Sequence, residues 1–176
     1  MELITSEQRD DLITTFVERD AFHLELKDRY ATAIEGSPFA KWLKGEPDDF
    51  SWLQPWQTRI RNATQTGKTV RRVRIISEPI TDYIRWEHSS TVFNLEVGED
   101  VRWLPRHLLP GEIVFPVDGH DWWLFDDRLV AVGHFRDDGS VRGHEIITDR
   151  TVVAGCIGVR DQLWPIAIPH SSYEPV

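Results

Sequence analysis

Residues 121–135 read Asp121-Trp122-Trp123-Leu124-Phe125-Asp126-Asp127-Arg128-Leu129-Val130-Ala131-Val132-Gly133-His134-Phe135, and this stretch decides the fold. Its two apolar, β-rich runs, 122–125 and 129–135, are joined by a short polar turn, which is typical of a β-hairpin. Upstream, a compact apolar strand around 73–76 is followed by a helical pattern over about 80–97 and a strand at 100–104. Such an order normally forms a right-handed parallel crossover. The sequence therefore predicts an α/β fold, α+β overall, whose mixed sheet contains a parallel β-α-β crossover and a following hairpin.

The remaining segments predict further elements around this core. Helical spacing predicts helices over about 6–20, 37–45, 55–66 and 149–164. The alternation from Phe22 to Lys27 predicts a strand that pairs back on 30–34, and further strands are expected at 143–148 and, at an edge, 113–115. We predict a single domain over 1–176, with an N-terminal α+β extension at 1–69, a core at 70–168 and a free tail at 169–176.

Composition limits the classes of function. The chain has 176 residues, a formal net charge of −9 and a single cysteine, and its first residues lack the basic start and apolar run of a signal peptide. We therefore expect a cytoplasmic protein that does not contact a membrane. The acidic balance argues against direct nucleic-acid binding, which needs clustered Lys and Arg. The densest basic patch, Arg71, Arg72 and Arg74, is interpreted as the solvated ends of a strand.

Motifs for metals, cofactors and nucleophilic catalysis are absent from the sequence. The seven histidines show no metal-ligand spacing, so neither a metal nor another cofactor is expected. The carboxylates around the hairpin could act as acid and base or bind a divalent cation, although turn formation and solvation are the favoured interpretation. If the protein is an enzyme, its candidate catalytic residues are His120, Asp121, Asp126 and Asp127.

Aromatic residues suggest a second kind of site. Because adjacent strand residues point to opposite faces, one of Trp122 and Trp123 is expected in the core and the other in a groove. Helix starts beside parallel strands are favoured ligand sites, and the predicted crossover helix begins near Tyr83. The candidate ligand-binding or partner-binding residues are Tyr83, Arg85, Glu87, Trp103, Trp122 and Trp123.

Several motifs together resemble an actinobacterial domain-of-unknown-function family, number 6879. They are Phe22-x-Leu24-Glu25, Gly45-Glu46, Arg72-Val73-Arg74, Glu78-Pro79-x-x-x-Tyr83-x-Arg85-x-Glu87, Gly98-Glu99-Asp100-Val101-Arg102-Trp103-Leu104 and Asp121-x-Trp123-Leu124-Phe125-Asp126-Asp127. Members of that family tend to be encoded near helix-turn-helix regulators. The resemblance implies a regulatory role and such a regulator, or another small protein, as partner.

A remoter resemblance covers only 70–164, whose order of elements is similar to one half of a phospholipase D-like phosphodiesterase. With Asp126 as the motif's acidic residue, Gly119 stands in place of the nucleophilic His and Asp121 in place of the Lys. A shift by one residue matches His120 and Asp127, but then Trp122 replaces the Lys. Either alignment loses a group on which phosphoryl transfer depends.

These observations predict a non-catalytic regulatory or sensor domain that is the partner of a helix-turn-helix transcriptional regulator. A deviant phosphodiesterase, metal-dependent or acid/base, is the first alternative, and a toxin-antitoxin-like module is the second. A sensor predicts a closed aromatic pocket, an enzyme predicts that His120, Asp121 and Asp126 converge in one pocket, and a partner-binding module predicts an exposed apolar patch.

Overall fold

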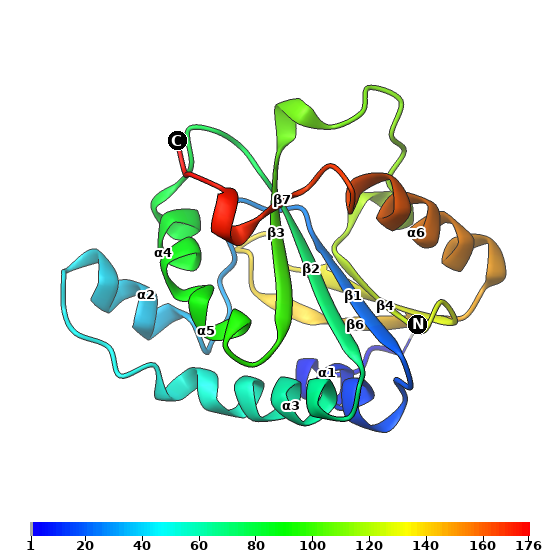
Figure 1. Cartoon of the computed structure of the whole chain (residues 1–176), viewed down its shortest axis with the longest axis horizontal. Coiled ribbons are helices and arrows are strands. Elements are labelled where there is room, and N and C mark those ends of the chain that lie inside the picture. Colours follow the sequence, from blue (N-terminus) through cyan, green and yellow to red (C-terminus); the bar gives the residue numbers. More distant parts are fainter. Residues whose placement is uncertain (1) are drawn as a thin grey trace.

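The computed structural model describes residues 2–176 and contains a seven-stranded mixed sheet with the order β6-β5-β4-β1-β2-β3-β7 (Figure 1). The pairs β1–β2 and β2–β3 are parallel, and the other neighbouring strands are antiparallel. The strands are β1 (Asp20–Glu25), β2 (Thr69–Ile76), β3 (Glu99–Pro105), β4 (Trp122–Phe125), β5 (Leu129–Phe135), β6 (Val141–Ile147) and β7 (Ile168–Pro169).

Helices cover both faces of the sheet. They are α1 (Ser6–Thr15), α2 (Gly36–Leu43), α3 (Gln54–Gln65), α4 (Asp82–Ser90), α5 (Val92–Leu95) and α6 (Arg150–Leu163). Helix α6 lies alone on one side of the sheet, whereas the other five lie on the opposite side (Figure 1). Within the described residues 2–176, none of the helices combines the length and apolarity needed to cross a membrane.

The face under α6 is an apolar core. Strand alternation directs Phe22, Leu24 and Val73 to this face, where they meet the apolar stripe of α6 that includes Cys156 and Leu163. All five of these side chains are completely buried. Burial of each apolar side chain of this size is worth about 1.5–3 kcal/mol, so this face supplies much of the stability of the fold.

On the opposite face, helices pack at the two ends of the strands. Ile13 of α1 and Ile60 of α3 pack at one end, and Ile84 and Trp86 of α4 pack at the other. The middle of this face carries polar side chains instead of an apolar core, and it is the part of the fold that positions the candidate site.

The predicted fold class is confirmed. Strand β2 is joined to β3 through α4 and α5, and the two strands are parallel, as expected for the crossover. Strands β4 and β5 form the predicted antiparallel hairpin. The expected helix over 80–97 is divided at Thr91 into α4 and the short α5.

Two expectations about the chain ends are wrong. Strand β1 pairs with β2 and β4 instead of with 30–34, so this part of the expected extension lies in the middle of the sheet. Parallel pairing between segments far apart in the sequence leaves no local pattern from which it could be predicted. The expected free tail at 169–176 is also wrong, because Pro169 pairs with Arg102 and Tyr173 is only 6% exposed. The edge strand expected at 113–115 does not form either, because this segment is irregular.

Candidate ligand-binding site

A cavity with a volume of about 830 Å³ lies on the sheet face opposite α6. We call it the central cavity. Its floor consists of side chains from β1, β2, β4 and β5, and α1, α3, α4 and the segment 30–35 surround it. Pockets that bind small molecules typically measure about 300–1,000 Å³, so the central cavity has room for an organic ligand.

The floor of the cavity carries charges at alternate positions of two neighbouring parallel strands. His23 of β1 is paired in register with Arg72 of β2, and Glu25 is paired with Arg74. Because strand side chains alternate between faces, all four point to the cavity face. Glu25, Arg72 and Arg74 are each less than 10% exposed. Charged residues this deeply buried in central strands are rare unless they are paired.

These charges form a continuous network of ion pairs. Glu25 accepts from Arg72 Nη1 at 2.6 Å and from Arg74 Nε at 2.7 Å, so its carboxylate bridges the two guanidinium groups. Arg72 Nε donates to Glu99 Oε1 at 2.7 Å, and Arg74 Nη2 lies 3.2 Å from Glu87 Oε1. Burial alone would raise the pKa of Glu25, but Arg74 and Arg72 lower it overall. The network therefore holds two cations and the carboxylate between them in their charged forms.

Glu87 of α4 is the incompletely paired member of this network. Its Oε1 faces Arg74, while its Oε2 is buried without a hydrogen-bond partner. Burial, together with the nearby carboxylates Glu25 and Glu35, raises the pKa of Glu87 to about 8, although Arg74 opposes the shift. Glu87 is therefore largely protonated at neutral pH and can still form a hydrogen bond inside the cavity.

Aromatic side chains form part of the cavity wall. The Trp123 ring stacks on the His23 ring, with centroids 4.2 Å apart and 12° between the planes. The centroid of the Trp56 ring lies 5.8 Å from that of Trp123. The Trp123 Nε1–H is buried without an acceptor. Burial, reinforced by Arg72 and Arg9, lowers the pKa of His23 well below its usual value, so its imidazole is neutral.

Asp121 lies at the β5 side of the cavity, beside Tyr30. It accepts from the backbone N–H of Leu26 at 2.9 Å and from the Tyr30 hydroxyl at 2.5 Å. Burial raises the pKa of Asp121 to about 7, against the opposing hydrogen bond from Tyr30. These hydrogen bonds hold the chain from Leu26 to Tyr30, which leads into the segment 30–35 beside the cavity. The buried position of Asp121 is therefore explained by a structural role.

The four candidate catalytic residues do not converge. Asp121 precedes β4 and Asp126 follows it, a separation of about 16 Å at 3.3 Å per residue. His120 lies outside both cavities, with its ring 5.0 Å from that of His134. Asp126 and Asp127 line a separate pocket of about 250 Å³. The geometry that an enzyme of the expected kind requires is therefore not formed by these residues.

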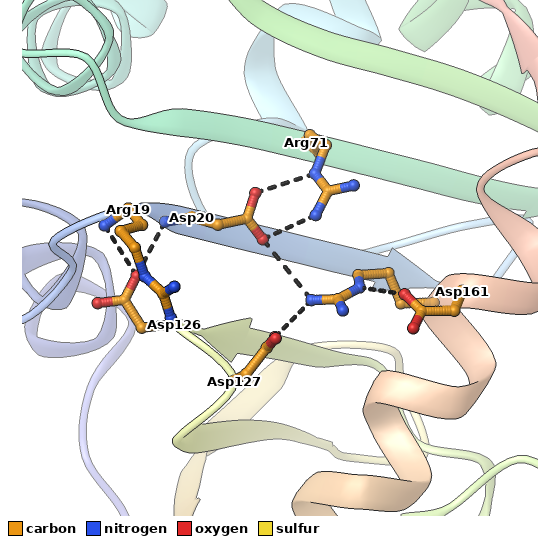
Figure 2. Close-up of a pocket in the computed structure, with 7 residues that line it drawn as sticks. Arg19, Asp20, Arg71, Asp126, Asp127 and Asp161 are labelled. Carbon is orange, nitrogen blue, oxygen red and sulfur yellow. Dashed lines mark hydrogen bonds and ion pairs between the residues drawn. The ribbon is translucent and has the colours of Figure 1, made fainter.

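The smaller pocket is a cluster of paired charges, shown in Figure 2. Asp127 pairs with Arg160 Nη1 at 2.5 Å, and Arg71 binds both oxygens of Asp20 at 2.9 Å. Asp126 accepts backbone N–H bonds from Glu18, Arg19 and Asp20 at 2.7, 2.9 and 2.8 Å. Burial alone would raise the pKa of Asp126, but these hydrogen bonds lower it. Asp126 thus holds the start of β1 against the β4–β5 turn.

Of the candidate binding residues, Tyr83, Glu87, Trp122 and Trp123 line the central cavity. Trp123 is the tryptophan on the cavity face, whereas the ring of Trp122 belongs to the core under α6. Two other members of the predicted set lie elsewhere. Arg85 is exposed on α4, and Trp103 Nε1 donates to His170 Nδ1 at 3.1 Å, which fixes the C-terminal segment.

The charged floor was missed by sequence reasoning. The interpretation of the basic patch as solvated strand ends is wrong for Arg72 and Arg74, which are 9% and 6% exposed. A signal was present, because Arg72 and Arg74 alternate with Val73 and Ile75 in a strand that the crossover places inside the sheet. Charges at period two in a central strand line a polar interior where helices cover that face of the sheet.

No group of three or more His, Cys, Asp or Glu side chains within residues 2–176 is arranged to hold a metal ion. In comparison with known proteins, the model of a family described as Domain of unknown function (DUF6879) matches residues 7–175. A search of curated proteins gives no match.

Proposed function

The chain belongs to the DUF6879 family, and we propose that it is a non-catalytic sensor domain that binds a small polar molecule in its central cavity. In this proposal the domain acts in the cytoplasm and passes its ligand state to a helix-turn-helix transcriptional regulator. The partner and its setting rest on the resemblance given by the motifs of the sequence.

The observation that carries the proposal is a charged network buried beneath a cavity of ligand size. Replacing a buried ion pair by apolar residues of similar volume is often neutral or stabilising, so Glu25, Arg72 and Arg74 are poorly explained by stability alone. Polar groups at the bottom of an aromatic pocket are what ligand recognition requires. The unpartnered Oε2 of Glu87 and Nε1 of Trp123 provide hydrogen-bonding capacity that the protein itself leaves unused.

Ligand binding can be tested with a matched pair of serine variants on α4. Ser90 is buried and lines the cavity, whereas its neighbour Ser89 is exposed and does not. Ser90→Leu places an apolar side chain in the cavity, and Ser89→Leu makes the same chemical change outside it. The purified proteins would be screened against a library of polar metabolites by thermal denaturation.

We expect compounds that raise the midpoint of the wild type and of Ser89→Leu but not of Ser90→Leu, because a ligand of the folded state stabilises by mass action. If no compound raises the wild-type midpoint, or if the rise is equal in Ser90→Leu, binding in the central cavity is refuted. Circular dichroism of both variants establishes that they are folded.

The regulatory part of the proposal needs a separate experiment. The protein would be titrated calorimetrically with the helix-turn-helix regulator encoded nearest to its gene, with and without a compound from the screen. We expect one-to-one binding whose affinity changes with the compound by about 5–150-fold, the usual range of coupling between sites. Absence of binding would remove the regulator from the proposal and leave the ligand site in place.

A second candidate is an acid/base phosphodiesterase whose acid is Glu87. The raised pKa of this group beside a cavity favours it, since such groups occur at active sites. It predicts slow hydrolysis of bis(p-nitrophenyl) phosphate that disappears in Glu87→Gln and persists in Asp126→Asn. Equal rates in Glu87→Gln and the wild type would reject this candidate.

A further inference from the structure

The central cavity holds an excess of acidic groups. Two guanidinium groups, Arg72 and Arg74, lie in its floor. The carboxyl groups in or directly behind the same surface are Glu25, Glu35, Glu87, Glu99 and Asp121. Arg72 is already paired with Glu25 and Glu99, and Arg74 is already paired with Glu25 and Glu87. The interior therefore lacks positive charge for its remaining carboxyl groups.

Arginines at the mouth of the cavity do not supply this missing charge. Arg9 pairs with Asp10, and Arg59 Nη2 donates to Asp11 Oδ1 at 2.8 Å. Arg136 is exposed and donates to a backbone carbonyl at 2.7 Å. Each of these three is thus engaged with groups of the rim.

One carboxyl oxygen of the cavity lining is left without a hydrogen-bond partner. Glu87 is only 7% exposed and lines the cavity, and its Oε2 has no partner among the described residues. Leaving a buried polar atom unpaired is costly, so a ligand group that forms a hydrogen bond or ion pair with this carboxyl group gains affinity. Tyr83, on the same helix, adds an aromatic ring to this part of the wall, and its hydroxyl donates to Glu35 at 2.8 Å.

The aromatic wall suits a flat cationic molecule. Faces of Trp and Tyr rings attract cations electrostatically and also pack against unsaturated groups. Trp123, with an Nε1–H that lacks an acceptor, favours a ligand that carries a hydrogen-bond acceptor as well. A metal ion is a poorer fit, since residues 2–176 contain no cluster of side chains arranged to ligate one.

Resting on the proposed function, we infer that the ligand of the central cavity is a small organic cation with a flat unsaturated body. Its ammonium or amidinium group pairs with Oε2 of Glu87, and its flat body lies against the rings of Trp123 and Trp56.

Protonation of the carboxyl groups in the cavity agrees with this inference. Burial raises the pKa of Glu87 to about 8 and that of Asp121 to about 7, so protons occupy carboxyl groups that lack cations. Glu87 is faced by Glu25, Arg72 and Arg74 from the strands, by Glu35 from segment 30–35 and by Tyr83 from its own helix. A bound cation would replace the proton on Glu87, so binding should tighten as the pH rises from 6 to 8.

The test uses three probes of similar shape and different charge: tryptamine, which is cationic, indole, which is neutral, and indole-3-acetate, which is anionic. Each would be titrated by calorimetry and by nuclear magnetic resonance into the full chain, into Glu87→Gln and into Glu96→Gln. Glu96 is exposed and outside the cavity, so its variant removes the same charge without changing the site. This control separates pairing with Glu87 from the general attraction of an acidic protein for cations.

We expect tryptamine to bind on the order of tenfold more tightly than indole, and indole-3-acetate to bind most weakly, because a charge-assisted hydrogen bond contributes about this factor. Glu87→Gln should remove the preference for tryptamine, while Glu96→Gln should keep it. Preference for indole or indole-3-acetate, or an unchanged preference in Glu87→Gln, would overturn the cation inference and leave the proposed ligand site standing. Failure of all three probes to bind at millimolar concentration would overturn the inference and count against the ligand site as well.

Discussion

The two faces of the sheet are made by the same strands, and the middle of one face differs in chemistry from the other. Neighbouring residues alternate between them: Leu24 and Val73 lie in the dry core under α6, whereas Glu25 and Arg74 lie in the floor of the central cavity. The dry face gains its stability from apolar burial. The charged face gains little from its ion pairs, because their attraction mainly offsets the cost of removing the ions from water. The dry face therefore stabilises the fold, as do the apolar clusters at the two ends of the other face, whereas the charged middle of that face is free to carry a site.

The adjacent tryptophans of β4 give the largest test of this comparison. Trp122 is completely buried under α6 and packs on Phe22 with centroids 5.6 Å apart. Trp122→Ala should lower the free energy of unfolding by about 4–5 kcal/mol, since it empties a large volume in a closed core. Trp123→Ala should cost about 2 kcal/mol, because its ring borders an existing cavity. Urea denaturation measures both.

The tryptophan variants also separate stability from binding. Trp123→Ala should remain folded and lose the ligands found for the wild type, whereas Trp122→Ala should lose binding only through unfolding. Equal losses of stability in the two variants would show that both faces contribute alike to the core, and the comparison would fail.

The arginines of β2 give the second test. Arg74→Met leaves Glu25 and Glu87 short of a cation and should cost about 3 kcal/mol, the lower end of the range for breaking a buried pair, because water in the cavity can hydrate them. Arg71→Met removes the pair with Asp20 on the opposite face, where the arginine side chain is 24% exposed, and should cost about 1 kcal/mol or less.

A double variant shows whether the stability lost in Arg74→Met is due to uncompensated negative charge. Glu25→Gln in the Arg74→Met background should recover part of the stability, because one of the uncompensated carboxylates is removed. A further loss in the double variant would indicate that the Arg74 side chain acts by packing instead of by charge.

The parts of this fold that could be predicted from sequence are those whose pattern of apolar and polar residues is local. The hairpin of β4 and β5 and the crossover from β2 to β3 each follow from neighbouring segments with a clear period. The position of β1 could not be predicted in this way, because its partner begins at Thr69 and parallel pairing has no turn to mark it. The same limitation produced the incorrect N-terminal hairpin.

The candidate site was predictable only in part. Tyr83, Glu87 and the cavity-facing tryptophan, Trp123, were selected from their place near a helix start or in the hairpin. Glu25, Arg72 and Arg74 were missed, because alternating polar residues are equally typical of a strand with one face in water. Only the arrangement of α1, α3 and α4 over that face shows that these charges are buried, and no single strand contains this information.

An effect smaller than those of Trp122→Ala and Arg74→Met is a pH dependence of the charged face. Burial raises the pKa of Glu87 to about 8, whereas the carboxyl group titrates near 4.5 when exposed. Between pH 6 and 8 the folded protein therefore retains a proton that the unfolded chain has lost, so the free energy of unfolding falls as the pH rises. The slope cannot exceed about 1.4 kcal/mol per pH unit, and a total of about 1–2 kcal/mol is expected, because Glu25 and Arg74 share the titration.

Glu87→Gln should remove this contribution, so the wild type should lose stability relative to the variant as the pH rises from 6 to 8 in urea denaturation. Asp121, whose pKa is raised in the same direction, remains in both proteins and should largely cancel in the difference. Glu96→Gln should run parallel to the wild type. Parallel curves for Glu87→Gln as well would mean that Glu87 is already ionised in the empty cavity, and Arg74 alone would then balance it. If the wild-type slope disappears when a cation that binds the cavity is added, the cation and the proton compete for Glu87. Either one supplies the positive charge that this carboxyl group needs.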